Sequence, residues 1–317
     1  MKKKLTLLIL FLFVSNTSYS EETVKLPKDT SSGYKRLFKS LDYGQYKDYG
    51  MQVVDIKDGH PVRSGKQSVR FEVRSGDCEK NYYDDSEWSD CDNDRERHEL
   101  SGGGDTMSEG EYWFSWSIYF PEDHINLYPL FNNYGQFHQK GGAPVFMFKE
   151  DNHGYTLLRT IDDNDHDEKV LINKTKMLGN WFDILINAKW TKKENGFFKV
   201  WVNDKLKYDY KGATMSAKSV YYKFGIYRTG ISRYINYKNL DAIWGCFKEK
   251  GYTTEENTAL FTLNKKKIGH KISMQIYKKC KDYYKHTEVP TTIVYFDEVR
   301  KGKSKESVIK NLSPLSN

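Results

Sequence analysis

Hydrophobic and polar residues alternate along much of this chain. In EYWFSWSIYF, residues 111–120, every even-numbered side chain is aromatic or aliphatic, and WFDILINAKW, residues 181–190, repeats the pattern. Alternate side chains of a strand share a face, so each segment predicts a strand with one buried face. Further strands are expected at 68–75, 95–101, 135–139, 143–149, 154–161, 197–203, 219–228 and 291–299, separated by Gly, Asn and Asp clusters. This succession, with no helices between the strands, predicts an all-β fold of antiparallel sheets packed as a sandwich or jelly roll.

The ends of the chain and one internal segment depart from this pattern. Residues 1–20 combine three lysines, an apolar core and a small-residue end, which is the layout of a secretory signal peptide. No second apolar run of membrane length follows, so we expect a chain that is exported, periplasmic or secreted, and not membrane-bound. Residues 21–317 are expected to form a single domain. Residues 240–290 are lysine-rich and are interpreted as an insertion before the last strand, and the tail from Lys301 as frayed.

Charge narrows the choice of ligand only slightly. The chain has 50 basic and 43 acidic residues, a net charge of +7, and loss of Lys2, Lys3 and Lys4 with the signal peptide would leave about +4. Nucleic-acid binders are usually more strongly basic, with clustered cations, so no nucleic-acid partner is expected. The mild excess suits an anionic ligand. We expect a monomer.

Four cysteines in an exported protein suggest two disulfides, and four cysteines allow three connectivities. The pairs that are close in sequence, Cys78 with Cys91 and Cys246 with Cys280, are favoured. None has the close spacing of a zinc site, so no metal role is expected for them.

Three of the predicted strands carry polar, reactive groups where a core strand would carry aliphatic ones. The segments are DRERHEL (94–100), GQFHQK (135–140) and VYYKFGIYRTG (220–230). At a spacing of two, each strand places a set of such groups on one face: Arg95, Arg97 and Glu99 in the first; Gln136 and His138 in the second; Tyr221, Lys223, Gly225 and Tyr227 in the third.

Each group also has an ordinary explanation. Arg97 and Glu99 would form an exposed ladder pair worth a fraction of a kcal/mol, His138 a surface or core histidine, and Tyr227 a packing residue. Gly225 either leaves space for a ligand against the sheet or marks a bulge.

Taken together, RHEL, QFH and YYKFGIY resemble, in this order, the three signature segments of the jelly-roll polysaccharide lyases. In alginate lyases of that type the segments read approximately R-[ST]-E-[LV]-R, Q-[IV]-H and Y-F-K-x-G-[VI]-Y-N-Q. GEYWFSWSIYFP followed by GQFHQKGG is also similar to the glucuronan-lyase and heparin-lyase-like families. The resemblance covers about residues 60–240 and the last strand, and it implies a concanavalin-A-like jelly roll. The chain departs at Ser101, Arg228 and Thr229, positions that would contact sugar, so the reaction carries over better than the substrate.

The resemblance implies cleavage of an anionic uronic-acid polysaccharide (alginate, glucuronan or a heparin-like polymer) by β-elimination. Arg97 and Gln136 would neutralise the sugar carboxylate, because a guanidinium fork and an amide donor suit it. Tyr227 would act as general acid, and as base for one epimer if Lys223 and Arg228 favour its phenolate. His138 would act as base or as neutraliser. The substrate contacts would come from Lys223, Arg228, Glu99, Arg95, Tyr221 and Gly225.

No cofactor is required by this chemistry. The acidic run DDNDHDE, residues 162–168, could hold a structural calcium ion through oxygen ligands, and a solvated turn is the alternative.

Two other functions compete with the lyase. Asp94, Glu96 and Glu99 are similar to the carboxylates of retaining jelly-roll glycosidases, whose two carboxyl groups lie about 5–5.5 Å apart. On an unbulged strand, however, Glu99 points away from the other two. A non-catalytic carbohydrate-binding module would need the aromatic and cationic groups but neither His138 nor Tyr227.

Overall fold

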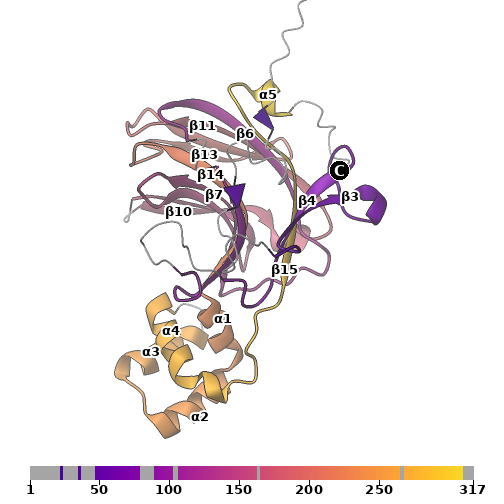
Figure 1. The fold of residues 1–317 in the computed structure, drawn as a ribbon. Helices are drawn as coiled ribbons and strands as arrows, with labels where there is room; N and C mark the ends of the chain where they lie inside the picture. The colour runs from indigo at the N-terminus through magenta and orange to yellow at the C-terminus, as the bar shows by residue number, and fades with distance from the viewer. Residues whose placement is uncertain are drawn as a thin grey trace, which may run out of the picture.

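The fold is that of a computed structural model (Figure 1). The structure describes residues 22–23, 35–36, 47–78, 89–102, 106–162, 165–264 and 268–309. The expected signal peptide, residues 1–20, lies outside the described residues.

Two antiparallel sheets form the body of the protein, which confirms the predicted all-β sandwich with a jelly-roll fold (Figure 1). In the first sheet the strand order is β13 (Lys205–Lys211), β12 (Phe197–Val202), β11 (Trp181–Trp190), β6 (Gly110–Tyr119), β15 (Thr292–Gly302), β4 (Gln67–Val73) and β3 (Met51–Asp55), and β1 (Glu22–Thr23) pairs with β15. In the second sheet it is β10 (Asp165–Asn173), β9 (Gly154–Asp162), β8 (Pro144–Asp151), β7 (Phe131–Gln139), β14 (Val220–Thr229), β5 (Arg95–Ser101) and β2 (Lys35–Arg36).

Aromatic side chains fill the space between the sheets. Trp116 of β6 stacks on Tyr222 of β14 with ring centroids 5.0 Å apart, and Phe146 of β8 stacks on Phe198 of β12 at 3.7 Å. All four rings are buried, as the alternation of their strands predicts. The inner face of the second sheet is therefore committed to the core, and its outer face is left for other groups.

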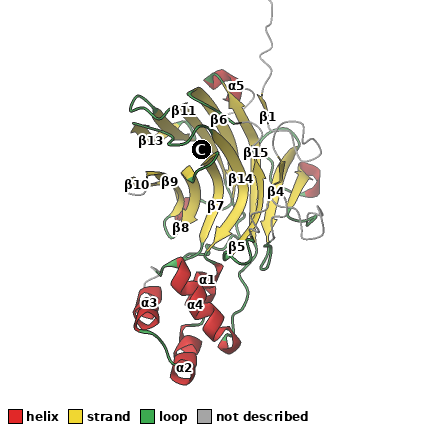
Figure 2. Cartoon of the chain, turned by 60° about the vertical axis from the view of Figure 1, so that its left-hand side comes forward, coloured by secondary structure: helices red, strands yellow, loops and turns green. Residues whose placement is uncertain are grey.

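A helical segment separates β14 from β15 and extends from one end of the sandwich (Figure 2). It contains α1 (Ile231–Lys238), α2 (Leu240–Lys250), α3 (Thr254–Asn264), α4 (His270–Cys280) and the short η4 (Lys281–Tyr283). It has a hydrophobic cluster of its own, which includes Ile243, Phe247 and Ile276 and which Leu127 and Leu130 join from the β6–β7 connection. The segment begins at residue 231, earlier than the expected insertion at 240, because the chain turns into a helix directly after β14.

Both favoured disulfides are confirmed, Cys78–Cys91 and Cys246–Cys280, and the second joins α2 to α4. The alternation did not predict β3, β10 or β13, nor the short helices η2 (Ile56–Asp58), η3 (Lys174–Lys176) and α5 (Lys305–Ile309). The expected fraying from Lys301 is wrong for the described part of the tail. Lys301 is buried in β15, and the carbonyl of Val308 in α5 accepts a hydrogen bond of 2.7 Å from the Ser115 hydroxyl. Nowhere in the described part of the chain does a helix combine the length and the apolarity that crossing a membrane would take.

Candidate active site

The three polar segments lie side by side as β5, β14 and β7 in the second sheet. The register sets Tyr227 of β14 opposite Arg97 of β5 and Asn133 of β7. Lys223 lies opposite Gln136, and Tyr221 opposite His138. Since these side chains alternate with the core residues of their strands, they share the outer face of the sheet. The structure thus brings together on one surface residues that lie far apart in sequence.

Arg97 is held by two carboxylates. Its Nε and Nη2 each lie 2.6 Å from an oxygen of Asp90, and its Nη1 lies 3.5 Å from Oε2 of Glu99. Gln136 Nε2 donates to the other Glu99 oxygen at 2.5 Å. The fork that would grip a sugar carboxylate is therefore occupied by Asp90, contrary to the expected arrangement. Asp90 was not among the predicted site residues, although its place beside the disulfide-bonded Cys91 was a signal that the residue is fixed in space.

Lys223 is a largely buried cation of this surface, and among the described residues its ammonium group has only the Tyr221 ring, whose centre lies 5.7 Å away, as a neighbour of this kind. Its side chain is 6% exposed, and its ammonium group makes no hydrogen bond or ion pair with any described residue. Burial lowers the pKa of Lys223 to about 8, although the nearby carboxylate of Glu99 opposes the shift. A buried charge without a partner is costly, so this ammonium group is poised to accept an anion.

His138 is prepared to act as a base. Its Nδ1 lies 2.8 Å from the backbone carbonyl of Gln139 and 3.2 Å from the Tyr221 hydroxyl. A carbonyl oxygen only accepts, so Nδ1 carries the proton and Nε2 the lone pair. Burial, and secondarily the charge of Lys223, lower the pKa of His138 to about 4. The imidazole is therefore neutral at neutral pH.

Tyr227 is suited to act as a general acid. The Arg97 guanidinium lies 3.9 Å from the centre of its ring. Burial raises the pKa of Tyr227 and outweighs the neighbouring Arg97 and Arg95. The phenol stays protonated at neutral pH, so the expected phenolate is not favoured.

Tyr227 and His138 lie on the same face of the sheet but at different positions along the strands. Tyr227 lies opposite Asn133, five residues from His138 along β7, which is about 17 Å between backbone positions in an extended strand. Tyr221, rather than Tyr227, is the phenol in contact with His138. Lys223 lies between these two positions.

Gly225 has a backbone reason for being glycine. Its φ is 134°, and a Cβ here would lie 2.5 Å from the carbonyl oxygen of His98 in β5. The pairing of β14 with β7 shifts register between Phe224 and Tyr227. The bulge explanation therefore accounts for this residue without a sugar, and its contact with the substrate stays a prediction.

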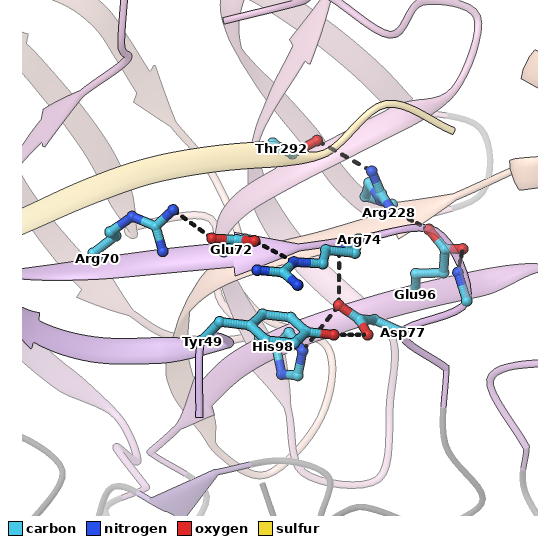
Figure 3. Close-up of polar contacts among 10 residues, drawn as sticks. Tyr49, Arg70, Glu72, Arg74, Asp77, Glu96, His98, Arg228 and Thr292 are labelled. Carbon is cyan, nitrogen blue, oxygen red and sulfur yellow. Dashed lines mark hydrogen bonds and ion pairs between the residues drawn. The ribbon is translucent and has the colours of Figure 1, made fainter. Parts of the chain in front are cut away.

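Arg228 was expected to contact the substrate, and the structure corrects this. Its side chain is fully buried on the inner face of β14, where it is paired with Glu96 of β5 (Figure 3). It also donates to the Pro290 carbonyl at 2.7 Å. Glu96 also accepts from the Gly76 backbone N–H at 2.7 Å. This pair faces the interior, so neither residue is available to a ligand on the outer face.

The same burial argues against the glycosidase alternative. Glu96 points inward with Arg228, while Glu99 lies on the outer face. Asp94, with φ 61°, accepts hydrogen bonds from the backbone and hydroxyl of Ser232 at 2.6 and 2.8 Å. The three carboxylates do not converge on one bond.

The acidic run lies at the β9–β10 hairpin, where Asp163 and Asn164 are outside the described residues. Among the residues that are described, no group of three or more His, Cys, Asp or Glu side chains is arranged to hold a metal ion. Calcium binding by this hairpin therefore stays a prediction.

A jelly roll with a cation, a neutral imidazole and a protonated phenol on its outer sheet face is a scaffold for acid–base chemistry on an anionic substrate. The chain belongs to the polysaccharide lyase family, because the family model described as "Polysaccharide lyase" matches residues 40–245. The protein is thus a polysaccharide lyase.

Several solved structures are similar in outline. An endo-β-1,4-glucuronan lyase from the fungus Trichoderma reesei aligns at 16% identity over 86% of this chain and 98% of its own, with a TM-score of 0.47. A marine alginate lyase of family PL7 from Zobellia galactanivorans aligns at 10% identity over 83% and 85%, with a TM-score of 0.44. An alginate lyase from Pseudomonas aeruginosa aligns at 16% identity over 54% and 79%, with a TM-score of 0.35. No curated protein matches the sequence.

Proposed function

We propose that this lyase cleaves a uronic-acid polysaccharide by β-elimination at the surface formed by β5, β14 and β7. The observation that carries the proposal is the largely buried Lys223, whose ammonium group makes no hydrogen bond or ion pair with any described residue and which lies opposite Gln136, two residues along β7 from His138. An anionic sugar would supply the missing partner. The polysaccharide lyase family match supports the reaction class.

The proposed reaction begins with the sugar carboxylate against Lys223. Its charge would otherwise oppose removal of the neighbouring C5 proton, because further negative charge develops on the same group. Nε2 of the neutral His138 takes the C5 proton. The electron pair of the C5–H bond becomes the C4–C5 double bond as the C4–O4 bond breaks. The protonated phenol of Tyr227 gives its proton to the departing O4. This step requires the side chains of Tyr227 and His138 to lean toward each other across the roughly 17 Å between their backbone positions, and the charge of Arg97, which acts on both groups, supports such an approach.

Arg97, Gln136 and Glu99 have a positioning role in this scheme. Glu99 accepts from Gln136 and lies 3.5 Å from Arg97, so the network holds a carboxylate in a fixed place near Lys223. The Glu99 charge helps keep the lysine protonated. Arg95, the second arginine near the Tyr227 ring at 5.8 Å, is the outer-face cation that would meet a further part of the polymer.

The substrate is proposed to be alginate, glucuronan or a heparin-like polymer, and the protein to be exported. Two disulfides support an oxidising compartment.

A panel of these polymers tests the proposal. We expect ultraviolet absorbance from an unsaturated uronide with at least one of them, and its loss in His138→Ala and in Tyr227→Phe with circular dichroism unchanged. Acid–base groups of this kind contribute about 10²- to 10⁴-fold, so each variant should lose at least two orders of magnitude in kcat. New reducing ends without the absorbance would indicate a hydrolase, and depletion of polymer without cleavage would indicate a binding module.

A further inference from the structure

A cavity of about 410 Å³ lies where the helical segment meets the sandwich. Its lining comes from the start of β7, the β8–β9 turn, β10 and the first turn of α1, and includes Phe131, Lys149, His153, Glu168 and Arg233. Figure 2 shows α1 directly below the ends of β7 and β5. The volume falls within the range of small-ligand sites.

The cavity continues the face that carries the candidate active site. Tyr227 pairs with Asn133, and Asn133 pairs with Lys149 of β8, so the three residues form one row across three strands. Phe131, the next lining residue, lies opposite Thr229 in the adjacent row. Strands are about 4.8 Å apart, which puts the backbone of Lys149 about 10 Å from that of Tyr227.

The carboxylates of the lining already have partners. Glu168 pairs with Lys149 at 2.5 Å. Glu150 accepts from the side chains of Asn126 and Tyr134 at 2.8 and 3.0 Å, and Asp151 from the backbone of His153 at 2.7 Å. Glu150 also lies 2.9 Å from Nε2 of His124. Only Glu168 pairs with Lys149, and the second cation of the wall has no direct counter-ion among the described residues.

That second cation is Arg233. Its Nε is buried without a hydrogen-bond partner among the described residues, and its Nη1 makes one long contact of 3.4 Å with the Pro129 carbonyl. Asp94, the acidic group that influences it, is engaged by Ser232 and by His270, which lies 3.2 Å away. Most of the donors of this guanidinium are unused, and its planar fork matches a carboxylate.

We propose that this cavity is a carboxylate-binding subsite, in which Arg233 holds a uronic-acid residue of the polymer at a distance from the bond that is cleaved. The inference rests on the proposed function for its choice of ligand. The proposed subsite gives the helical segment a role in binding, since α1 supplies the cation and the second sheet supplies the opposite wall of the cavity. Arg233 contributes to substrate binding and takes no part in proton transfer.

The experiment compares Arg233→Ala with Lys238→Ala, which removes an exposed cation from the same helix outside the cavity. Steady-state cleavage of the preferred uronide polymer gives KM and kcat. Calorimetry with uronide oligosaccharides on the inactive His138→Ala background gives Kd directly. A hydrogen-bonded charge pair is worth about tenfold to a hundredfold in binding. We expect Arg233→Ala to raise KM and Kd by that factor with kcat within about twofold, Lys238→Ala to change neither, and Arg233→Lys to recover part of the loss.

Unchanged Kd and KM in Arg233→Ala, with the fold intact by circular dichroism, would overturn the subsite. An equal loss of affinity for carboxyl-reduced oligosaccharides would also overturn it, because it would show a packing effect rather than recognition of charge. Failure of the wild type to form unsaturated product would count against the proposed function, whereas the calorimetric comparison would still decide the subsite. If neither polymer nor oligosaccharide binds in an Arg233-dependent way, the inference is wrong.

Discussion

The two perturbed pKa values on the outer sheet face predict a bell-shaped pH profile for kcat/KM. The mechanism needs a neutral His138, whose pKa is lowered to about 4, and a charged Lys223, whose pKa is lowered to about 8. Because kcat/KM reports the groups of the free enzyme, activity should rise through about pH 4, level off and fall through about pH 8. The raised pKa of Tyr227 places loss of the phenol proton above this alkaline limb.

Lys223→Arg isolates the alkaline limb. A guanidinium stays charged throughout this range, so the fall near pH 8 should disappear while the acid limb remains. The plateau value should also drop, because arginine differs in shape. Lys248→Arg, an exposed exchange on α2, is the matched control and should keep both limbs. Initial rates at low substrate concentration, followed by ultraviolet absorbance from about pH 3 to pH 10, give the profile. A limb near pH 8 that persists in Lys223→Arg would refute the assignment.

The lowered pKa of Lys223 also determines how the free energy of unfolding changes with pH. Its value in the folded state lies below the ordinary value of 10.5, so the unfolded state binds more protons between about pH 8 and pH 10.5, and the free energy of unfolding rises with pH there. The difference between the two pKa values corresponds to about 3 kcal/mol. Below pH 8 the charged lysine therefore destabilises the fold by up to about that amount. Lys223→Met should raise the melting temperature at pH 6 while abolishing cleavage.

Two further predictions concern parts of the protein away from the outer sheet face. Arg228→Met should lower the free energy of unfolding by about 3–5 kcal/mol in chemical denaturation, because Glu96 would be left buried without its cation, and KM should stay unchanged while the protein is folded; a raised KM with unchanged stability would contradict the inward placement of Arg228. Replacing Cys246 and Cys280 by serine opens a loop of 34 residues, for which chain entropy gives about 4 kcal/mol. Helical circular dichroism should then be lost at lower temperature than in the wild type, and equal melting would show that the helical segment does not depend on this disulfide.

The sequence by itself determined the strands with strong alternation and the residues that share a face within each strand. Tyr221, Lys223 and Tyr227 lie on one face of β14 as their spacing requires. The same alternation placed Arg228 with the core residue Phe224, and the error over Arg228 came from letting the family resemblance override that pattern. The disulfide pairing could also be predicted from the sequence, because both disulfides join cysteines that are close in sequence.

Only the tertiary structure decided which groups are free to act. Alternation fixes a face within one strand, but strand neighbours depend on pairings between segments many residues apart, so the approach of Asp90 to Arg97 was invisible in the sequence. The pKa values of His138 and Lys223 follow from burial, which depends on everything packed around them. The helical segment that places Arg233 against the sheet is a further tertiary feature, since its helices share a core with Leu127 and Leu130, which come from the distant β6–β7 connection.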